Sequence, residues 1–164
     1  MSLSHSGSRL AFAVAQMAIG CDVERVKPRP FDAIAAAFFR AEEADELART
    51  ADQQTLFYRL WTAKEAVAKA LGLTLAEGLR RVGISPPIED WRQPPALRAD
   101  TFWLFGRGDE RYAVALAIPR ASLKLPDVDI CLADIVGNDE VSIGERMPLS
   151  PSRGWTLSLA IVEG

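Results

Sequence analysis

The chain has 164 residues, 49% hydrophobic and 25% charged, a composition that excludes a fully disordered chain, a collagen and a disulfide scaffold. Its 19 Lys and Arg residues against 22 Asp and Glu residues give a formal net charge of −3, so it has no overall attraction for nucleic acid or anionic membranes. The length suggests one domain of ordinary size, and any anionic ligand requires a local group of basic side chains.

The N-terminal part predicts two short strands. Residues 9–18 form an apolar run rich in Val, Phe and Ala, which indicates a buried strand. Residues 19–26 alternate in polarity, with Asp22 and Glu24 on one face, which is typical of a half-buried strand. Gly20 would allow a tight join between the two strands.

Helices are predicted next. Prolines in 27–30 end the second strand, and helical patterns follow over 31–40 and 42–49. The strongest helical pattern covers 53–71 and is closed by Gly72, a typical C-terminal cap. The apolar stripe of this helix comprises Leu56, Leu60, Ala63, Val67 and Leu71.

After residue 72 the patterns favour strands. We expect them at 79–84, 101–105, 112–118, 128–135 and 155–162. The second and third of these flank a short glycine-containing turn and predict a β-hairpin. Because helices lie before residue 72 and most strands after it, we expect an α+β fold, with a small antiparallel sheet packed against a long helix and shorter helices.

The apolar run 10–20 ends at Cys21, as the cleavage site of a bacterial lipoprotein signal would. The run is too short to cross a bilayer and contains Gln16, so we favour a strand and expect no membrane association. The two cysteines, Cys21 and Cys131, have no metal-ligand spacing. We interpret them as buried thiols of a protein in a reducing compartment, the cytoplasm.

Three acidic residues form a candidate metal site. Asp22 and Glu24 leave the same face of a strand, and Glu65 lies in the middle of the long helix. Carboxylate oxygens are ligands that Mg²⁺ prefers. The pattern alone leaves a second interpretation open, in which the strand carboxylates face solvent and Glu65 forms an ordinary helical pair with Lys69.

Basic residues could bind phosphate groups near these carboxylates. Lys64 and Lys69 lie on the long helix, Lys27 follows the acidic strand, and His5 is the only histidine. Solvent-facing positions are the alternative for all of them. The sequence has no phosphate-binding glycine loop, no dinucleotide-binding motif, no nucleophile elbow and no Cys-x-x-Cys motif.

A series of short motifs occurs in a fixed order along the chain. They are Ser-His-Ser at 4–6, Gly-Cys-Asp-Val-Glu at 20–24, Phe38-Phe39 with Glu43, Leu-Trp-Thr-Ala-Lys-Glu-Ala-Val-Ala-Lys-Ala at 60–70 and Gly-Asp-Glu-Arg-Tyr-Ala-Val-Ala-Leu-Ala at 108–117. Together they resemble the 4′-phosphopantetheinyl transferase superfamily, in particular its surfactin-synthetase-activating type, over roughly residues 4–118.

The resemblance implies transfer of the phosphopantetheine arm of coenzyme A to a serine of an acyl- or peptidyl-carrier protein. It also implies that Asp22, Glu24 and Glu65 hold Mg²⁺ against the pyrophosphate of coenzyme A. Glu65 would further help to deprotonate the acceptor serine, and Lys69 would neutralise charge on the leaving group. Such a reaction needs alignment and charge stabilisation rather than a nucleophile on the enzyme.

The same resemblance implies residues that bind coenzyme A. Lys64 and Lys69 would contact the pyrophosphate and the leaving bisphosphate, and His5 would contact the 3′-phosphate. Lys27 would lie near that same phosphate, as a weaker candidate.

The chain also departs from the family pattern. Before the Ser-His-Ser motif the related proteins have an N-terminal half of about a hundred residues, which is missing from this sequence. We therefore expect a homo-oligomer that replaces that half, and the alternative is a non-catalytic relative that binds carrier proteins or acts in assembly. We expect residues 1–120 to form the family domain and 121–164, which have no counterpart, to be an extension packed on it.

Overall fold

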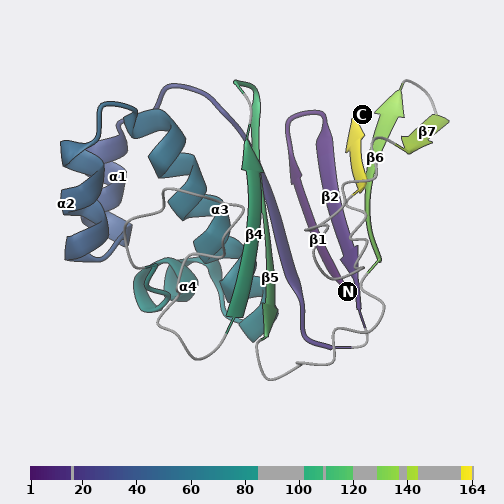
Figure 1. Ribbon diagram of the computed structural model, residues 1–164, viewed down its shortest axis with the longest axis horizontal. Coiled ribbons are helices and arrows are strands. Elements are labelled where there is room, and N and C mark those ends of the chain that lie inside the picture. The colour runs from purple at the N-terminus through teal and green to yellow at the C-terminus, as the bar shows by residue number, and fades with distance from the viewer. Residues whose placement is uncertain are drawn as a thin grey trace, which may run out of the picture.

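Helices gather at one end of the molecule and strands at the other in the computed structural model (Figure 1). The structure describes residues 1–15, 17–84, 102–108, 110–119, 129–136, 140–143 and 160–163. The helices of this part are α1 (Phe31–Phe38), α2 (Ala41–Arg49), α3 (Gln53–Leu71) and α4 (Leu75–Arg81). Its strands are β1 (Ser2–Ser6), β2 (Arg9–Val14), β3 (Gly20–Arg25), β4 (Phe102–Gly108), β5 (Tyr112–Pro119), β6 (Asp129–Val136), β7 (Glu140–Ile143) and β8 (Ala160–Glu163).

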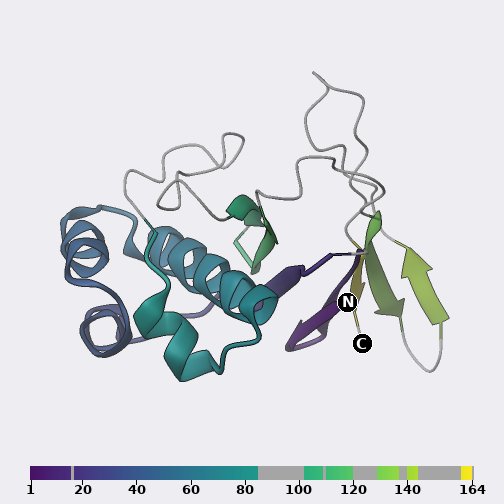
Figure 2. The same cartoon turned by 90° about the horizontal axis from the view of Figure 1, so that it is seen from below.

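The strands form two antiparallel sheets, which confirms the predicted α+β class. One sheet has the order β3-β5-β4, and the other has the order β1-β2-β6-β7, with β8 paired to β2. Helix α3 packs on β3 and β5 (Figure 2). The β4–β5 hairpin confirms the predicted strand pair around the glycine-containing turn. Strand β1 was not expected from composition, because its serines and histidine favour no regular structure.

The long helix begins and ends as its sequence predicts. The Asp52 side chain accepts a hydrogen bond from the Thr55 N–H, and Gly72 adopts the left-handed conformation with φ of 67°. Leu60, Ala63 and Val67 of the predicted stripe are buried under the sheet, in one core cluster with Ala115 and Ala117 of β5. Leu71, by contrast, is exposed, because the helix ends there beyond the edge of the core.

Gly20 has a different role from the predicted one. It opens β3 instead of joining two strands, and a Cβ at this position would lie 1.8 Å from the Ala66 carbonyl oxygen of α3. Only glycine therefore lets β3 approach the helix this closely. This contact sets the distance between the acidic strand and the helix that carries Glu65.

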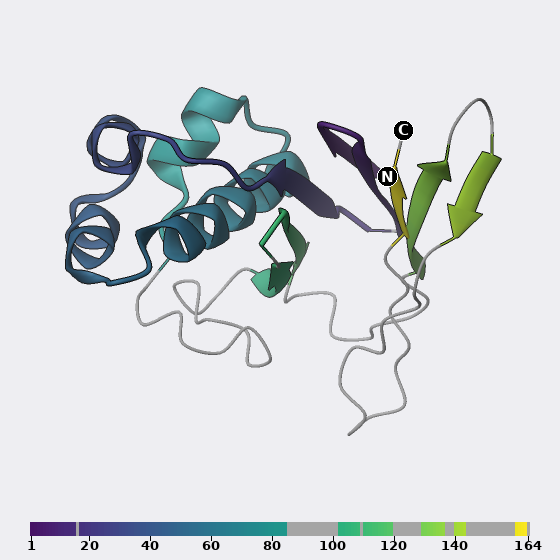
Figure 3. The same cartoon turned by 90° about the horizontal axis from the view of Figure 1, so that it is seen from above.

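The predicted strand over residues 79–84 is wrong. Residues from Leu75 to Arg81 form helix α4 instead, and Figure 3 shows it beside α3. Its start is fixed by a capping box, in which the Thr74 hydroxyl accepts from the Glu77 N–H and the Glu77 carboxylate accepts from the Thr74 N–H. Local capping thus prevails over the short apolar pattern that suggested a strand.

The later predicted strands are described in part. Strand β6 matches the prediction for 128–135, and it pairs with β2, so the C-terminal part of the chain completes the sheet that begins at the N-terminus. Of the strand predicted at 155–162, residues 155–159 lie outside the described residues, and β8 covers the end. Within the described part, no helix is both long enough and apolar enough to cross a membrane.

Candidate metal centre

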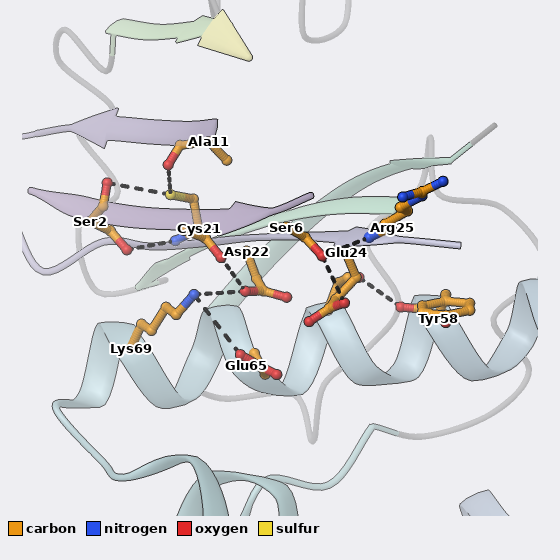
Figure 4. Close-up of polar contacts among 12 residues, drawn as sticks. Ser2, Ser6, Ala11, Cys21, Asp22, Glu24, Arg25, Tyr58, Glu65 and Lys69 are labelled. Carbon is orange, nitrogen blue, oxygen red and sulfur yellow. Dashed lines mark hydrogen bonds and ion pairs between the residues drawn. The ribbon is translucent and has the colours of Figure 1, made fainter. Parts of the chain in front are cut away.

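Three carboxylates from two elements converge between β3 and α3. Asp22 and Glu24 are two residues apart on β3, so both side chains leave the face that α3 covers, and Glu65 on α3 meets them there (Figure 4). One oxygen from each of the three carboxylates lies within 4.8 Å of the others. The structure thus brings together residues that are more than 40 positions apart in the sequence.

The two oxygens of Asp22 have different surroundings. Oδ1 accepts a hydrogen bond of 2.7 Å from the Ser4 hydroxyl and one of 2.6 Å from the Lys69 ammonium group. Oδ2 is buried and has no hydrogen-bond partner among the described residues. A buried carboxylate oxygen without a donor is costly, so this oxygen is suited to a cation.

Glu24 is held in a similar way. Its Oε2 accepts from the Ser6 hydroxyl at 3.1 Å and lies 3.5 Å from a guanidinium nitrogen of Arg29. Arg29 is itself fixed by Tyr58, whose hydroxyl accepts from its Nε at 3.1 Å. The Tyr58 hydroxyl also donates to the Lys27 carbonyl, so a residue of α3 fixes the segment that follows β3.

Burial opposes ionisation of all three carboxyl groups, and repulsion from Asp22 adds to this effect for Glu24 and Glu65. The pKa of Glu65 is raised to about 8, first by burial and then by the negative charge of Asp22, although Lys69 opposes the shift. Burial raises the pKa of Asp22 against the opposing charge of Lys69, and burial followed by the charge of Asp22 raises the pKa of Glu24. A cation placed among them would relieve this repulsion.

The residues present fit a hard divalent cation such as Mg²⁺. They offer carboxylate oxygens from three side chains, and one of these oxygens is buried without a donor among the described residues. Mg²⁺ takes oxygen ligands and usually uses only a few carboxylates, completing its shell with water and substrate phosphate. Asp22, Glu24 and Glu65 would hold the ion.

Lys69 lies at the edge of this cluster. Its ammonium nitrogen is 2.6 Å from Asp22 Oδ1 but 3.9 Å from Glu65 Oε2, so it is chiefly a partner of the strand carboxylate and not an ordinary helical pair of Glu65. Its side chain is 30% exposed, which leaves it accessible to an anionic ligand. This arrangement does not favour the interpretation of Asp22 and Lys69 as solvent-facing residues.

Two of the predicted phosphate contacts, Lys27 and His5, lie outside the cluster of three carboxylates. Lys27 is exposed just beyond β3, and its positive charge partly opposes the rise that burial causes in the pKa of Glu24. His5 lies on β1 between Ser4 and Ser6, and strand alternation places its exposed side chain on the opposite face from these serines. The structure therefore does not bring His5 to the three carboxylates.

The prediction that Lys64 contacts coenzyme A is corrected by the structure. Its side chain is fully buried, and its ammonium group donates to Glu43 Oε2 at 2.6 Å and to the Val82 carbonyl. Glu43 also accepts from the backbone N–H groups of Arg40 and Ile84. This buried ion pair ties α2 and α3 to the segment after α4, so Lys64 has no access to a ligand.

Sequence reasoning missed the partners that hold the carboxylates. Ser4 and Ser6 belong to the Ser-His-Ser motif, which by itself gives the two serines no role, and no sequence pattern points to Arg29 or Tyr58. The available signal was the alternation of serine with Leu3 and His5, which is compatible with a strand that has one hydroxyl-bearing face. Only the packing of β1 beside β3 shows what that face contacts.

A family model and several known proteins that are similar to this chain all point to one family. The family model of the 4′-phosphopantetheinyl transferase superfamily matches residues 18–117, which include all three carboxylates and Lys69. The 4′-phosphopantetheinyl transferase psf-1 of Bacillus pumilus is 41% identical over 80 residues, which are 48% of this chain and 34% of the relative.

Further relatives match a similar stretch. A 4′-phosphopantetheinyl transferase of Bacillus subtilis is 43% identical over 77 residues, covering 46% of this chain and 34% of the relative. The 4′-phosphopantetheinyl transferase AcpT of Salmonella typhimurium is 37% identical over 75 residues, covering 43% of this chain and 39% of the relative. The matched part of the chain thus spans little more than a third of the length of these relatives.

Proposed function

The chain belongs to the 4′-phosphopantetheinyl transferase superfamily, and on that premise we propose that it transfers the phosphopantetheine arm of coenzyme A to a serine of an acyl- or peptidyl-carrier protein. The observation that carries this proposal is the convergence of Asp22, Glu24 and Glu65 beside the ammonium group of Lys69. A divalent cation and a lysine at one point suit a reaction at a pyrophosphate.

Asp22, Glu24 and Glu65 are the proposed Mg²⁺ ligands. When bound, Mg²⁺ would supply positive charge that stabilises the pyrophosphate during transfer. The donors on Oδ1 of Asp22 keep that carboxylate oriented, and its Oδ2, which has no partner in the part of the chain that the structure describes, is available as a ligand. Burial of the cluster strengthens every charge interaction within it.

Glu65 and Lys69 are the proposed catalytic residues. Lys69 is partly exposed at the edge of the carboxylates, where its ammonium group can neutralise phosphate charge that builds up as the bisphosphate leaves. Glu65 would accept the proton of the carrier serine, directly or through water, as that hydroxyl forms its bond to phosphorus. The enzyme itself supplies no covalent nucleophile.

Coenzyme A would be held by basic residues around the cluster. Lys69 is the main candidate, and Lys27 is exposed on the Glu24 side of the cluster. His5 is a candidate contact of the 3′-phosphate, and it would bind that group on the other face of β1, away from the three carboxylates. Lys64 is left out, because it is buried against Glu43.

We further propose that copies of the chain associate. Met1, Leu3 and Val14 lie on the face of the β1–β2 pair away from β3, and they are among the most exposed large apolar residues described. Apolar residues grouped in this way often mark an interface.

Two further proposals concern location and domain organisation. We propose that the protein is cytoplasmic, since the free, buried thiol of Cys21 suits a reducing compartment. We also propose that residues 121–164 belong to the same domain as 1–120.

The test is a direct transfer assay. The protein is incubated with coenzyme A, Mg²⁺ and a panel of apo acyl- and peptidyl-carrier proteins, and the intact mass of each carrier is measured. We expect at least one carrier to gain a single phosphopantetheine group, and we expect EDTA to abolish the gain. A panel with no modified carrier would instead favour a non-catalytic, carrier-binding relative.

A further inference from the structure

We propose that Ser4 and Ser6 of β1 are positioning residues of the metal centre, which orient the carboxylates of Asp22 and Glu24 and thereby set the affinity for Mg²⁺. The inference rests on the proposed function, because it concerns the metal site assigned there. It assigns a role to a strand whose side chains would otherwise only join two sheets.

Strands β1 and β3 meet through side chains. Each is an edge strand of a different sheet, and the two share no backbone pairing among the described residues although they lie in contact. The serines on one face of β1 bridge the gap. The Ser2 hydroxyl accepts from the Cys21 N–H at 2.9 Å, and the Ser6 hydroxyl accepts from the Arg25 N–H at 3.0 Å (Figure 4).

Two of these serines also contact metal carboxylates, and they do so in the same way. Ser4 donates to Asp22 Oδ1, the oxygen that Lys69 also contacts. Ser6 donates to Glu24 Oε2, the oxygen that Arg29 also contacts. In each carboxylate, one oxygen thus receives a hydroxyl and a cationic group.

Because the hydroxyl and the cationic group both bind one oxygen of a carboxylate, the second oxygen of that carboxylate is left without these donors. For Asp22 the consequence is visible, because Oδ2 is buried and has no partner in the described part of the chain. A hydroxyl that anchors one oxygen fixes the rotation of the carboxylate about its last bond, so the other oxygen is held in place for a ligand. Groups that orient metal ligands in this way typically change metal affinity by about 10- to 100-fold when removed.

A purely structural role makes a different prediction. If the serines only satisfied the free edge of β3, then Ser2, Ser4 and Ser6 would be equivalent, and each would affect stability without affecting the metal. Ser2 is the matched control, since it lies on the same face of the same strand and its hydroxyl binds the Cys21 N–H of β3 instead of a carboxylate.

The experiment measures Mg²⁺ binding by calorimetry on the full chain, with Mg²⁺ alone and no coenzyme A, together with the melting temperature of each variant. We expect Ser4→Ala and Ser6→Ala to bind Mg²⁺ about 10- to 100-fold more weakly than the parent. The effect should be larger for Ser4, which makes the shorter bond to the more buried carboxylate. Ser4→Thr keeps a hydroxyl and should restore affinity, and Ser2→Ala should lower only the melting temperature.

Two results would overturn the inference. One is parent-like Mg²⁺ affinity in Ser4→Ala and Ser6→Ala, which would leave the proposed metal site standing. The other is an equal loss of affinity in Ser2→Ala, which would mean that the serines act through the fold alone. A parent protein that binds no Mg²⁺ would overturn the metal site and this inference together, whereas a parent that binds Mg²⁺ but transfers nothing would contradict only the proposed reaction.

Discussion

Two lysines of α3 illustrate how strongly side-chain direction decides a role. Lys64 is fully buried against Glu43, whereas Lys69 reaches Asp22 at the edge of the carboxylate cluster. Five residues along a helix correspond to a rotation of about 140°, so the two side chains cannot face the same ligand. Their shared presence in one motif therefore does not imply a shared function.

Replacing Lys64 with methionine tests this distinction. The change leaves the carboxylate of Glu43 buried without its cation, so we expect a loss of about 3–5 kcal/mol in the free energy of unfolding. The double variant Lys64→Met with Glu43→Leu should recover part of that loss. The KM for coenzyme A should stay unchanged when it is measured at a temperature at which the variant is still folded. A variant with a raised KM and the same free energy of unfolding as the parent would show that Lys64 binds substrate.

The acidic residues were predictable from sequence, and their supporting residues were not. Asp22 and Glu24 follow from strand alternation, and Glu65 follows from its place in a strongly periodic helix. The roles of Ser4 and Ser6 depend on an edge-to-edge contact between two sheets. No local pattern encodes a contact of that kind.

At the scale of elements, the approach of β3 to α3 determines whether the three carboxylates meet. Gly20 permits that approach, because a Cβ there would overlap the Ala66 carbonyl oxygen. The sequence suggested a turn at this glycine, since close packing and a turn both select the same residue. Tertiary contact, and not backbone conformation, is the reason for glycine here.

Gly20→Ala should therefore weaken Mg²⁺ binding as well as the fold. We expect a loss of about 1–3 kcal/mol from overpacking, together with a measurable drop in Mg²⁺ affinity as Asp22 moves away from Glu65. Gly72→Ala is the matched control, because it strains a left-handed residue by about 1–2 kcal/mol, but the added Cβ would meet no described atom within 4 Å. Calorimetric titration of both variants with Mg²⁺ checks this, and equal affinities would refute the packing argument.

The strengths and failures of element prediction have one physical cause. Helix α3 was predicted with the observed bounds, since nineteen residues of consistent periodicity lie between a good N-cap and a glycine. The prediction of a strand over 79–84 fails because the seven residues of α4 are too few for a clear period, and the helix depends on the capping box at Thr74. Short elements depend on their caps and neighbours more than on their pattern.

At the scale of the whole molecule, the carboxylate cluster should make stability depend on pH. The fold raises the pKa of Glu65 from an ordinary 4.5 to about 8, so between these values the folded chain holds a proton that the unfolded chain has lost. Without Mg²⁺, stability should fall as pH rises through this window. Burial shifts Asp22 and Glu24 in the same direction.

Mg²⁺ should reverse this trend, because it binds the ionised carboxylates. We expect the gain in melting temperature between EDTA and excess Mg²⁺ to be larger at pH 8 than at pH 6. Glu65→Gln should weaken the pH dependence in EDTA, since one of the three groups with a raised pKa is gone. A gain that is the same at both pH values would argue against these carboxylates as the site of binding.

Self-association is a second property of the whole molecule. Leu3 is 54% exposed on the outer face of β1, and we expect Leu3→Glu to convert an oligomer to a monomer in sedimentation equilibrium. Leu75→Glu serves as the control, because Leu75 is 49% exposed on α4, where an acidic residue at the helix start is tolerated. A parent protein that sediments as a monomer at micromolar concentration would exclude the interface.

The most direct test of the central claim is the rate at which Glu65→Gln modifies a carrier protein, measured by the intact mass of the carrier against the parent under the same Mg²⁺ concentration. This variant keeps the size of the side chain but removes a negative charge from the proposed metal ligands, so transfer should fall by orders of magnitude while the melting temperature in EDTA does not fall. Lys69→Ala should lower the rate less, and exposed Glu42→Gln should leave it unchanged. Transfer by Glu65→Gln at the parent rate would contradict the account.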